Sequence, residues 1–576
     1  MNLYSAIDER KAVMRSKSKR LLIIVSVVVI LGMLLGACSP AAQQAPPTQA
    51  PQAAPTTAPA SAAPKPETTP TKPAAAPTAA VQRGGILPVA HPGDAPSLDL
   101  IQEVSYLVAK PLSGAYNSLI RHEQLDENKL IADLAKSWEV SKDGLTYTFN
   151  LNEGVKWHDG KPFSSADVKY TLDRIRKPPE GTLSARQDLL NPVVSIETPD
   201  AKTVKMTLNR NSASMLEMLG LIFFAIYPKH VLEEKGHMRD VAVGTGPFKM
   251  KEYKRGISFT FEKNPNYFKE GLPYLDGYTL YIIPDKTARL AAFRAGRVYL
   301  DTYRHEPPAI DIIEKEMKDV AIAFRGFADG FNQLQFNVTK KPFSDVRVRQ
   351  AANLAIDRFD MESLKPGLYI KGGFMKPGGA WALPEAEMVA MPGYAKGEAK
   401  EKEREQAKKL LAEAGASGLT LKFLVRKGHY EDQAVFAQDQ LAKIGVKCNL
   451  EVLETAAYYD KLAAFEWDLT NRGSGNLFDD PDVCIGAEWT TTAGKNYGKY
   501  SNKEIDKLYE EQAGQLDPVK RKESVMKMHK ILHDDVAAVI LHWFTQPVGY
   551  YKKVKNWAPR TSHYKYFGFE QAWLEK

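Results

Sequence analysis

Alternating helical and extended patterns of apolar residues run along the chain from about residue 400 to residue 472. From Glu401 to Ala414, apolar residues recur at helical spacing, and Gly415 is suited to follow the last turn of a helix. The pattern then predicts a strand, a helix, a strand, a short helix and a strand, at Leu419–Val425, Glu431–Ile444, Val446–Leu453, Ala457–Phe465 and Trp467–Thr470. Strands that alternate with helices indicate a parallel sheet joined by right-handed crossovers.

Polar residues follow two of these predicted strands. Arg426 comes directly after the first strand, and the segment Asn471–Asn476, which includes Arg472, comes after the last. Ligands of open α/β sheets bind beyond the carboxyl ends of the parallel strands. We therefore expect a binding site where these two segments meet.

The earlier half of the chain has a different pattern. Leu145–Leu151 alternates as a strand does, and Val204–Leu208 is a second predicted strand. Turn sequences lie between such segments, at Lys142–Gly144 and Asp159–Gly160. Short strands and turns predict an α/β region with an antiparallel component.

Length and composition indicate a multidomain globular protein. The chain has 576 residues, of which 44% are hydrophobic, and this length predicts two or three domains. The first 37 residues hold six basic and two acidic residues, so the net charge falls from +8 to +4 without them. So small an excess, without a clustered basic face, gives no support for a nucleic-acid partner.

The N-terminal segment has the features of a secretory signal. The basic stretch Arg15–Arg20 precedes the apolar run Leu21–Leu35, which is shorter than the ~20 residues that span a bilayer. The sequence from Leu35 to Cys38, LGAC, resembles the bacterial lipobox. We interpret residues 1–37 as a lipoprotein signal peptide and Cys38 as the lipidated N-terminus of an extracytoplasmic, membrane-anchored protein. The alternative is an ordinary signal anchor with an incidental cysteine.

A low-complexity segment separates this signal from the globular part. Residues 38–83 are rich in Ala, Pro and Thr, a composition that predicts a disordered tether. Globular composition begins near Gly84. Two further cysteines, Cys448 and Cys484, could pair outside the cytoplasm, but we expect two separate buried thiols.

An ordered set of short motifs resembles the oligopeptide, dipeptide and nickel-binding family of solute-binding proteins. The motifs extend over most of the chain after Gly84 and are, in order, Leu134–Glu139, Asp143–Phe149, Val155–Phe163 (VKWHDGKPF), Ala166–Val168, Gly244–Phe248, Asn264–Phe268, Leu334–Asn337, Pro342–Ala351 and Ala355–Arg358. The resemblance implies an α/β, two-lobed periplasmic-binding-protein-like fold, a Venus flytrap with an additional smaller domain.

The family also implies how the chain divides. Residues 84–330 would form lobe I, with the additional domain at about 122–240, residues 331–545 would form lobe II, and residues 546–576 would return to lobe I. The resemblance further implies a monomer that captures a peptide or similar small molecule between its lobes and delivers it to the transmembrane subunits of an ABC permease. Oligosaccharides, opines and nickel chelates are alternative ligands within the same fold.

Candidate ligand-binding residues follow from the resemblance and from the strand ends. In peptide-binding relatives an Arg past the strand that matches Arg426 pairs with the ligand carboxylate, and a guanidinium suits this role because it donates two parallel hydrogen bonds. Relatives place an Asp for the ligand ammonium where this chain has Leu477, so Asp479 substitutes, with Asn476 nearby, or the ligand has no free amino terminus. The further candidates are Arg472, Glu103, Tyr116, Tyr458 and Trp489.

Catalytic and metal motifs are not evident in the sequence. His158–Asp159 lies in a turn that the family motif explains, and the chain has no HExxH, GxSxG or GK[ST] motif of the known kinds. We therefore expect no catalytic residue, cofactor or resident metal. A secreted hydrolase and a lipid-anchored adhesin are the alternatives to a binding protein.

Overall fold

The computed structural model describes residues 80–576, apart from residues 104, 127–128, 183, 327–329, 429, 476–477, 561, 563 and 567. The interpretations of the signal peptide, of Cys38, of most of the tether and of Asn476 therefore lie outside the described residues. Within the described ranges, no helix combines the length and the apolar character that crossing a bilayer requires.

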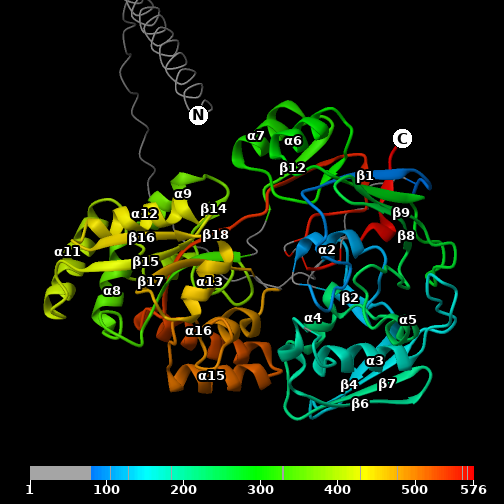
Figure 1. Ribbon diagram of the computed structural model, residues 1–576, viewed down its shortest axis with the longest axis horizontal. Helices are drawn as coiled ribbons and strands as arrows, with labels where there is room; N and C mark the ends of the chain where they lie inside the picture. Colours follow the sequence, from blue (N-terminus) through cyan, green and yellow to red (C-terminus); the bar gives the residue numbers. More distant parts are fainter. Residues whose placement is uncertain are drawn as a thin grey trace, which may run out of the picture. The chain divides into compact units, whose positions relative to one another are not determined.

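Six strands of the later part of the chain form one mixed sheet. Their order across the sheet is β14, β18, β13, β17, β15 and β16. The bounds are β13 (Gly330–Phe336), β14 (Tyr369–Ile370), β15 (Thr420–Arg426), β16 (Lys447–Leu453), β17 (Leu469–Gly475) and β18 (Ala538–Phe544). β15 runs parallel to β16 and β17, whereas β13 is antiparallel to β17 and β18. Figure 1 shows β15, β16, β17 and β18 within this sheet, with α8 and α11 beside it.

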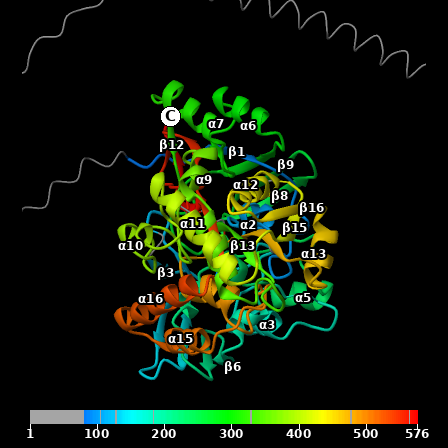
Figure 2. The same ribbon diagram turned by 90° about the vertical axis from the view of Figure 1, so that its left-hand side faces the viewer.

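Helices connect and cover these strands. Their bounds are α8 (Val346–Ala355), α9 (Arg358–Leu364), α10 (Glu385–Val389), α11 (Glu398–Glu413), α12 (Glu431–Ala442), α13 (Thr455–Ala463), α14 (Ala487–Trp489), α15 (Lys503–Gly514) and α16 (Pro518–Asp534). The predicted alternation of helices and strands from residue 400 to residue 472 is confirmed, with ends that differ by a few residues. α15 and α16 pack against each other as a pair (Figure 2).

The prediction that the last of these strands ends at Thr470 is wrong. β17 continues to Gly475, and β13 pairs with it along its whole length, from Phe336 opposite Leu469 to Gly330 opposite Gly475. The segment that was expected to leave the sheet is therefore part of a central strand. The hydrophobic pattern does not indicate this part of the strand, because its side chains are polar and contact buried polar partners instead of apolar ones.

A second, seven-stranded sheet combines both ends of the described chain. Its order is β12, β19, β11, β1, β10, β9 and β8. The strands are β1 (Ile86–His91), β8 (Phe248–Lys254), β9 (Ser258–Lys263), β10 (Gly277–Ile282), β11 (Leu300–Asp301), β12 (Ala321–Phe324) and β19 (Val548–Tyr551). The helices α2 (Tyr106–Leu112), α6 (Lys286–Arg294) and α7 (Pro307–Glu316) belong to the same region of the chain. β1 lies parallel to β10 and β11, and the other pairs are antiparallel.

A third sheet is antiparallel and has four strands, in the order β4, β5, β7 and β6. The bounds are β4 (Ala135–Val140), β5 (Thr146–Leu151), β6 (Val193–Asp200) and β7 (Thr203–Leu208), and the helices nearby in sequence are α3 (Ser165–Arg176), α4 (Met215–Leu219) and α5 (Lys229–Lys235). The antiparallel component predicted for the earlier half is confirmed. Smaller two-stranded pairs are β2 (Ile120–His122) with β3 (Leu130–Ala132), and β20 (Val554–Lys555) with β21 (Trp573–Leu574).

The chain passes between the six- and seven-stranded sheets along two neighbouring segments. β12 pairs with β19 in one sheet, up to Phe324 opposite Val548, and β13 pairs with β18 in the other, from Gly330 opposite Phe544. Gly326, between β12 and β13, has a φ of +71°. A Cβ atom there would lie 2.1 Å from the backbone oxygen of Gln546, so only glycine fits against the second segment.

Both described cysteines are buried and free. Cys448 lies in β16, and Cys484 lies in the short helical segment Asp482–Gly486. Burial raises the pKa of the Cys448 thiol to about 12, so it stays protonated and unreactive. The prediction of two separate buried thiols is confirmed.

Candidate functional site

A pocket of about 150 Å³ lies at the carboxyl ends of the parallel strands β15 and β17. We call it the strand-end pocket, and its lining residues are Arg426, Tyr430, Tyr458, Tyr459, Asn471, Arg472, Gly473, Ser474, Gly475, Lys495 and Tyr497. All of these residues lie between positions 426 and 497. The position agrees with the expectation that a ligand would bind beyond the carboxyl ends of this sheet.

Arg426 is the last residue of β15 and contacts two tyrosines. Its Nη2 donates a hydrogen bond to the hydroxyl of Tyr430 at 2.5 Å, and its Nη1 donates to the hydroxyl of Tyr459 at 3.3 Å. The guanidinium also lies 4.4 Å from the ring centre of Tyr430, within cation–π range. Among the described residues, no carboxylate forms an ion pair with Arg426, so the positive charge of this half-buried side chain faces neutral partners.

Arg472, by contrast, is neutralised inside the protein. Its Nη2 donates to Glu488 Oε2 at 2.6 Å, and its Nε donates to Gln335 Oε1 at 3.2 Å. Glu488 is fully buried and also accepts hydrogen bonds from Ser474 at 2.5 Å and from Gln333 at 3.1 Å. The structure therefore gives Arg472 a structural partner in the wall of the pocket, in addition to its place on the pocket surface.

Lys495 is the third cation of the pocket. Its Nζ lies 3.3 Å from Ser474 Oγ and 3.7 Å from Glu488 Oε1, and its side chain is 44% exposed. Three tyrosines of the pocket remain neutral, because burial raises the pKa of Tyr430 and Tyr497 and raises the pKa of Tyr458 to about 12. The strand-end pocket is therefore an electropositive site with aromatic walls.

Tyr458 and Trp489, both sequence-predicted candidates, are mainly packing residues. Tyr458 lines the strand-end pocket, but it is buried with Leu424 and Leu462, and its hydroxyl lies 2.9 Å from Thr470 Oγ1. Trp489 is 1% exposed, is stacked on Phe331 at 5.6 Å between ring centres, and does not line this pocket.

Glu103 and Tyr116 lie away from the strand-end pocket. Tyr116 is 1% exposed and packs against Tyr227 at 5.2 Å between ring centres. Glu103 accepts a hydrogen bond from Ser97 Oγ at 2.8 Å, and its backbone oxygen accepts one from Arg186 at 2.7 Å. The structure therefore does not bring these two side chains together with Arg426.

Asp479 faces a loop instead of the strand-end pocket. Its Oδ2 accepts a hydrogen bond from the backbone nitrogen of Ala380 at 3.0 Å, and a Cβ at Gly379 would lie 2.2 Å from the same oxygen. Burial raises the pKa of this carboxyl. Asp479 thus fixes a close loop contact, and the neighbouring candidate Asn476 lies outside the described residues.

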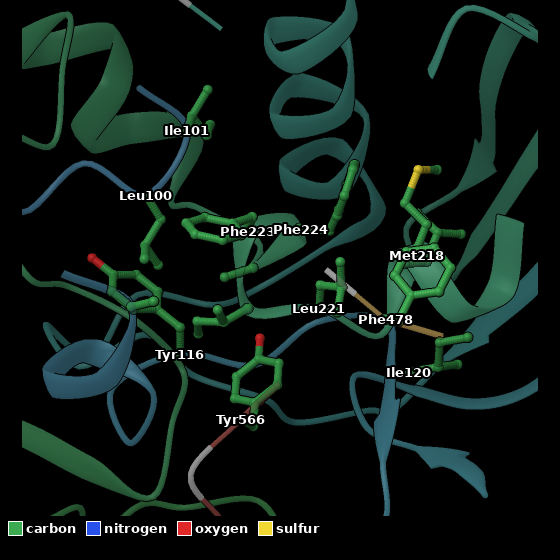
Figure 3. Packing of buried hydrophobic residues seen from close by; sticks show 14 of the residues in the cluster. Leu100, Ile101, Tyr116, Ile120, Met218, Leu221, Phe223, Phe224, Phe478 and Tyr566 are labelled. Carbon is green, nitrogen blue, oxygen red and sulfur yellow. The ribbon is translucent and has the colours of Figure 1, made fainter. Parts of the chain in front are cut away.

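Phe478 connects this segment with the other part of the molecule. It belongs to a large apolar cluster whose members come from both the six-stranded and the seven-stranded sheet regions. Figure 3 shows its ring beside Met218 and Leu221, in the same cluster as Tyr116 and Phe223. The two regions are therefore in apolar contact next to the segment where the sequence departs from the peptide-binding pattern.

Several residues of the pocket were not among the sequence candidates. Tyr430, Tyr459, Asn471, Lys495 and Tyr497 line it together with Arg426. Asn471 could have been singled out, because it lies at the strand end that the pattern predicted. The other four could not, because helix α12, helix α13 and the segment after α14 bring them to the pocket from separate parts of the chain.

Comparison with known proteins places the chain in a family. The model of the family described as "Bacterial extracellular solute-binding proteins, family 5 Middle" matches residues 129–496. The chain is 29% identical over 456 residues to di/tripeptide-binding protein 1 of Pseudomonas aeruginosa, a match that covers 73% of this chain and 82% of that protein.

Solved structures give the same result. The binding protein DppA of Helicobacter pylori, in complex with the peptide STSA, matches with a TM-score of 0.70 and 26% identity over 86% of this chain and 99% of that one. AgaA of A. tumefaciens R10, in complex with agropinic acid, matches with a TM-score of 0.71 and 27% identity over 85% of this chain and 99% of that one.

The chain belongs to this family of bacterial extracellular solute-binding proteins. It has the two-lobed α/β fold of periplasmic binding proteins, and it is the substrate-binding component of an ABC importer, which acts outside the cytoplasm. The two-lobed fold and the solute-binding role implied by the sequence motifs are thus confirmed.

Proposed function

We propose that the strand-end pocket binds the carboxylate end of a short peptide, which lobe closure then encloses for delivery to an ABC permease. The observation that carries the proposal is Arg426, a half-buried guanidinium at a strand end whose ion-pair partner is missing among the described residues. A guanidinium binds a carboxylate through two parallel hydrogen bonds, which fix its position and orientation. The peptide and di/tripeptide ligands of the relatives support this ligand class.

The test compares peptides that differ only at the carboxyl end. Tripeptides with a free carboxylate should bind at least tenfold more tightly than the same tripeptides with a C-terminal amide, as measured by isothermal titration calorimetry. Arg426→Gln should remove this preference. Lys427→Gln is the matched control, because Lys427 is the next residue and its exposed ion pair with Glu454 lies outside the pocket. Equal affinity for acid and amide in the unmodified protein would refute the proposal.

A second ligand class is a small organic acid without a free ammonium group, and the relative AgaA is in complex with an acid, agropinic acid. Leu477 stands where peptide-binding relatives have an Asp for the ammonium, and Asp479, whose Oδ2 accepts from the Ala380 backbone, does not line the strand-end pocket. N-acetylated peptides distinguish the two classes. If acetylation leaves affinity unchanged, the amino terminus is not recognised and the organic acids become the better candidates.

We further propose the domain boundaries that the family implies, with a hinge at the two segments between the sheets. Residues 84–330 and 546–576 would form lobe I, and residues 331–545 would form lobe II. The strand membership supports this division, because β12 and β19 belong to one sheet, whereas β13 and β18 belong to the other. Paired hinge segments allow rigid lobes to close while a few residues absorb the change in dihedral angles.

We also propose that Cys38 carries lipid and holds a monomeric protein at the membrane. The support is the sequence LGAC after an apolar run, followed by a tether-like composition. Cys38→Ser should move the protein from the membrane fraction to the soluble fraction, because stable anchoring needs more than one acyl chain and the N-terminal cysteine supplies them. An immunoblot of fractionated cells is the measurement. Retention of the variant in the membrane fraction would rule out this anchor.

A further inference from the structure

The charges around the strand-end pocket do not balance. Among the residues that the structure describes, three cations line it, Arg426, Arg472 and Lys495, and the buried carboxylate of Glu488 is the acidic group that pairs with them. Glu488 lies 2.6 Å from Arg472 and 3.7 Å from Lys495, so one negative charge is shared by two cations. Two positive charges are left for a ligand.

We infer that the pocket takes a ligand end with two separate carboxylates, such as a peptide whose last residue is Glu or Asp. This inference rests on the proposed function, in which Arg426 holds the α-carboxylate. Lys495 would hold the side-chain carboxylate. Its side chain is 44% exposed, whereas that of Arg472 is 9% exposed, so Lys495 is the cation of this pair that is open to a ligand.

Arg426 and Lys495 reach the pocket from two different segments of the chain. Arg426 ends β15 beside Arg472 of β17, because Val425 pairs with Asn471. Ser474, which Lys495 contacts, lies two residues further along β17, about 6.6 Å at the usual rise of a strand. The two cations thus belong to different positions along β17, where two carboxylates of one ligand can each engage one cation.

The size of the pocket fits one terminal residue. Its volume of about 150 Å³ is below the ~300–1,000 Å³ of sites that enclose a whole drug-sized ligand. The aromatic walls of Tyr430, Tyr459 and Tyr497 would pack against the methylene groups of a Glu side chain. The rest of the peptide would lie outside the pocket.

The test measures the preference for a C-terminal Glu over Gln, which differ in charge but hardly in shape. Calorimetric titration of the full-length protein in detergent, at low salt, should give a dissociation constant at least tenfold lower for Ala-Ala-Glu than for Ala-Ala-Gln. Lys495→Met keeps the aliphatic stem and should reduce this ratio to near one. Lys499→Met, an exposed lysine outside the pocket, should keep the full preference.

Each contrary result has a distinct meaning. Binding of both peptides with equal affinity, or a preference that persists in Lys495→Met, overturns the inference and leaves the proposed function standing. If neither Ala-Ala-Glu nor Ala-Ala-Gln binds, the inference and the proposed function are both overturned. Competition against Ala-Ala-Glu separates the two kinds of dianion: glutarate should compete, and displacement by inorganic phosphate alone would overturn the two-carboxylate reading.

Discussion

At the scale of single residues, Glu488 determines which cation of the pocket is open to a ligand. Its carboxylate is buried and fixed by hydrogen bonds from Arg472, Ser474 and Gln333, so it serves the protein and not the ligand. A glutamate on the protein surface would have little effect on the charge of the site, because solvent would screen it. Here its burial makes it the group on which the charge of the whole site depends.

Glu488→Gln should destabilise the protein by about 3 to 5 kcal/mol, because it leaves the buried guanidinium of Arg472 without a counter-charge. The free energy of unfolding, measured by urea denaturation, checks this value. Glu454→Gln is the control, since Glu454 forms an exposed ion pair with Lys427, and it should cause no measurable change. Similar losses in both variants would show that the buried pair contributes no more than a surface pair.

The sequence predicts only part of this site. Arg426 could be found because it directly follows a strongly patterned strand, and the position of the pocket followed from the same rule. The role of Arg472 could not be predicted, because its partner Glu488 lies 16 positions further along the chain and no local pattern connects them. Glu103 and Tyr116 came from family position alone, and the structure places both away from the pocket.

At the scale of elements, the two segments between the sheets form the proposed hinge. Gly326 lies directly against the backbone of Gln546, so the two segments are in contact at the point where the chain changes sheets. Glycine is required at this position for two reasons: the φ angle is positive, and a Cβ atom would have no room.

Gly326→Ala should lower stability more than Gly181→Ala does. Gly181 has nearly the same φ, +72°, but a Cβ there would meet nothing within 4 Å, so that variant measures the dihedral strain alone, roughly 1 kcal/mol. The additional loss in Gly326→Ala measures the clash with Gln546. Thermal unfolding of both variants supplies the comparison. Equal losses of stability would show that the two segments can move apart at Gly326 without a cost in free energy.

The elements themselves were largely predictable where periodicity was strong. The helices around residues 400–463 and the strands β15 and β16 follow from apolar spacing, whereas the second half of β17 did not. Its sequence, NRGSG, has no apolar alternation, because its side chains bond to buried polar groups such as Glu488 and Gln335. A central strand whose side chains form buried polar contacts cannot be recognised from the pattern of hydrophobic residues.

At the scale of the whole molecule, contacts join residues 213–214 to Asp482 and Ala513, which lie far apart from them in the sequence. Ser214 donates a hydrogen bond to Asp482 at 2.5 Å, and the backbone of Ala213 donates to Ala513 at 2.9 Å. With the proposed boundaries, these contacts connect the two lobes. They would have to break when the lobes move apart, so they stabilise the arrangement in which the lobes touch.

Ser214→Asp should weaken ligand binding by tenfold or more, because it places a second carboxylate against Asp482 and lowers the population of the closed form. Titration calorimetry with the preferred ligand provides the measurement. Ser137→Asp, an exposed change on β4 of the four-stranded sheet, is the control and should leave affinity unaltered. If Ser214→Asp binds as well as the unmodified protein, these contacts do not contribute to closure.

The strand-end pocket is built from one half of the protein alone, since its walls all lie between residues 426 and 497. Opening of the lobes would therefore remove the contacts that the other lobe makes with a ligand and lower its affinity, but the contacts of the strand-end pocket with a charged ligand would stay in place. Release of the ligand to the permease then does not follow from lobe opening alone. Release needs positively charged groups at the entrance of the permease that compete for the ligand, or a conformational change that displaces the ligand from the pocket.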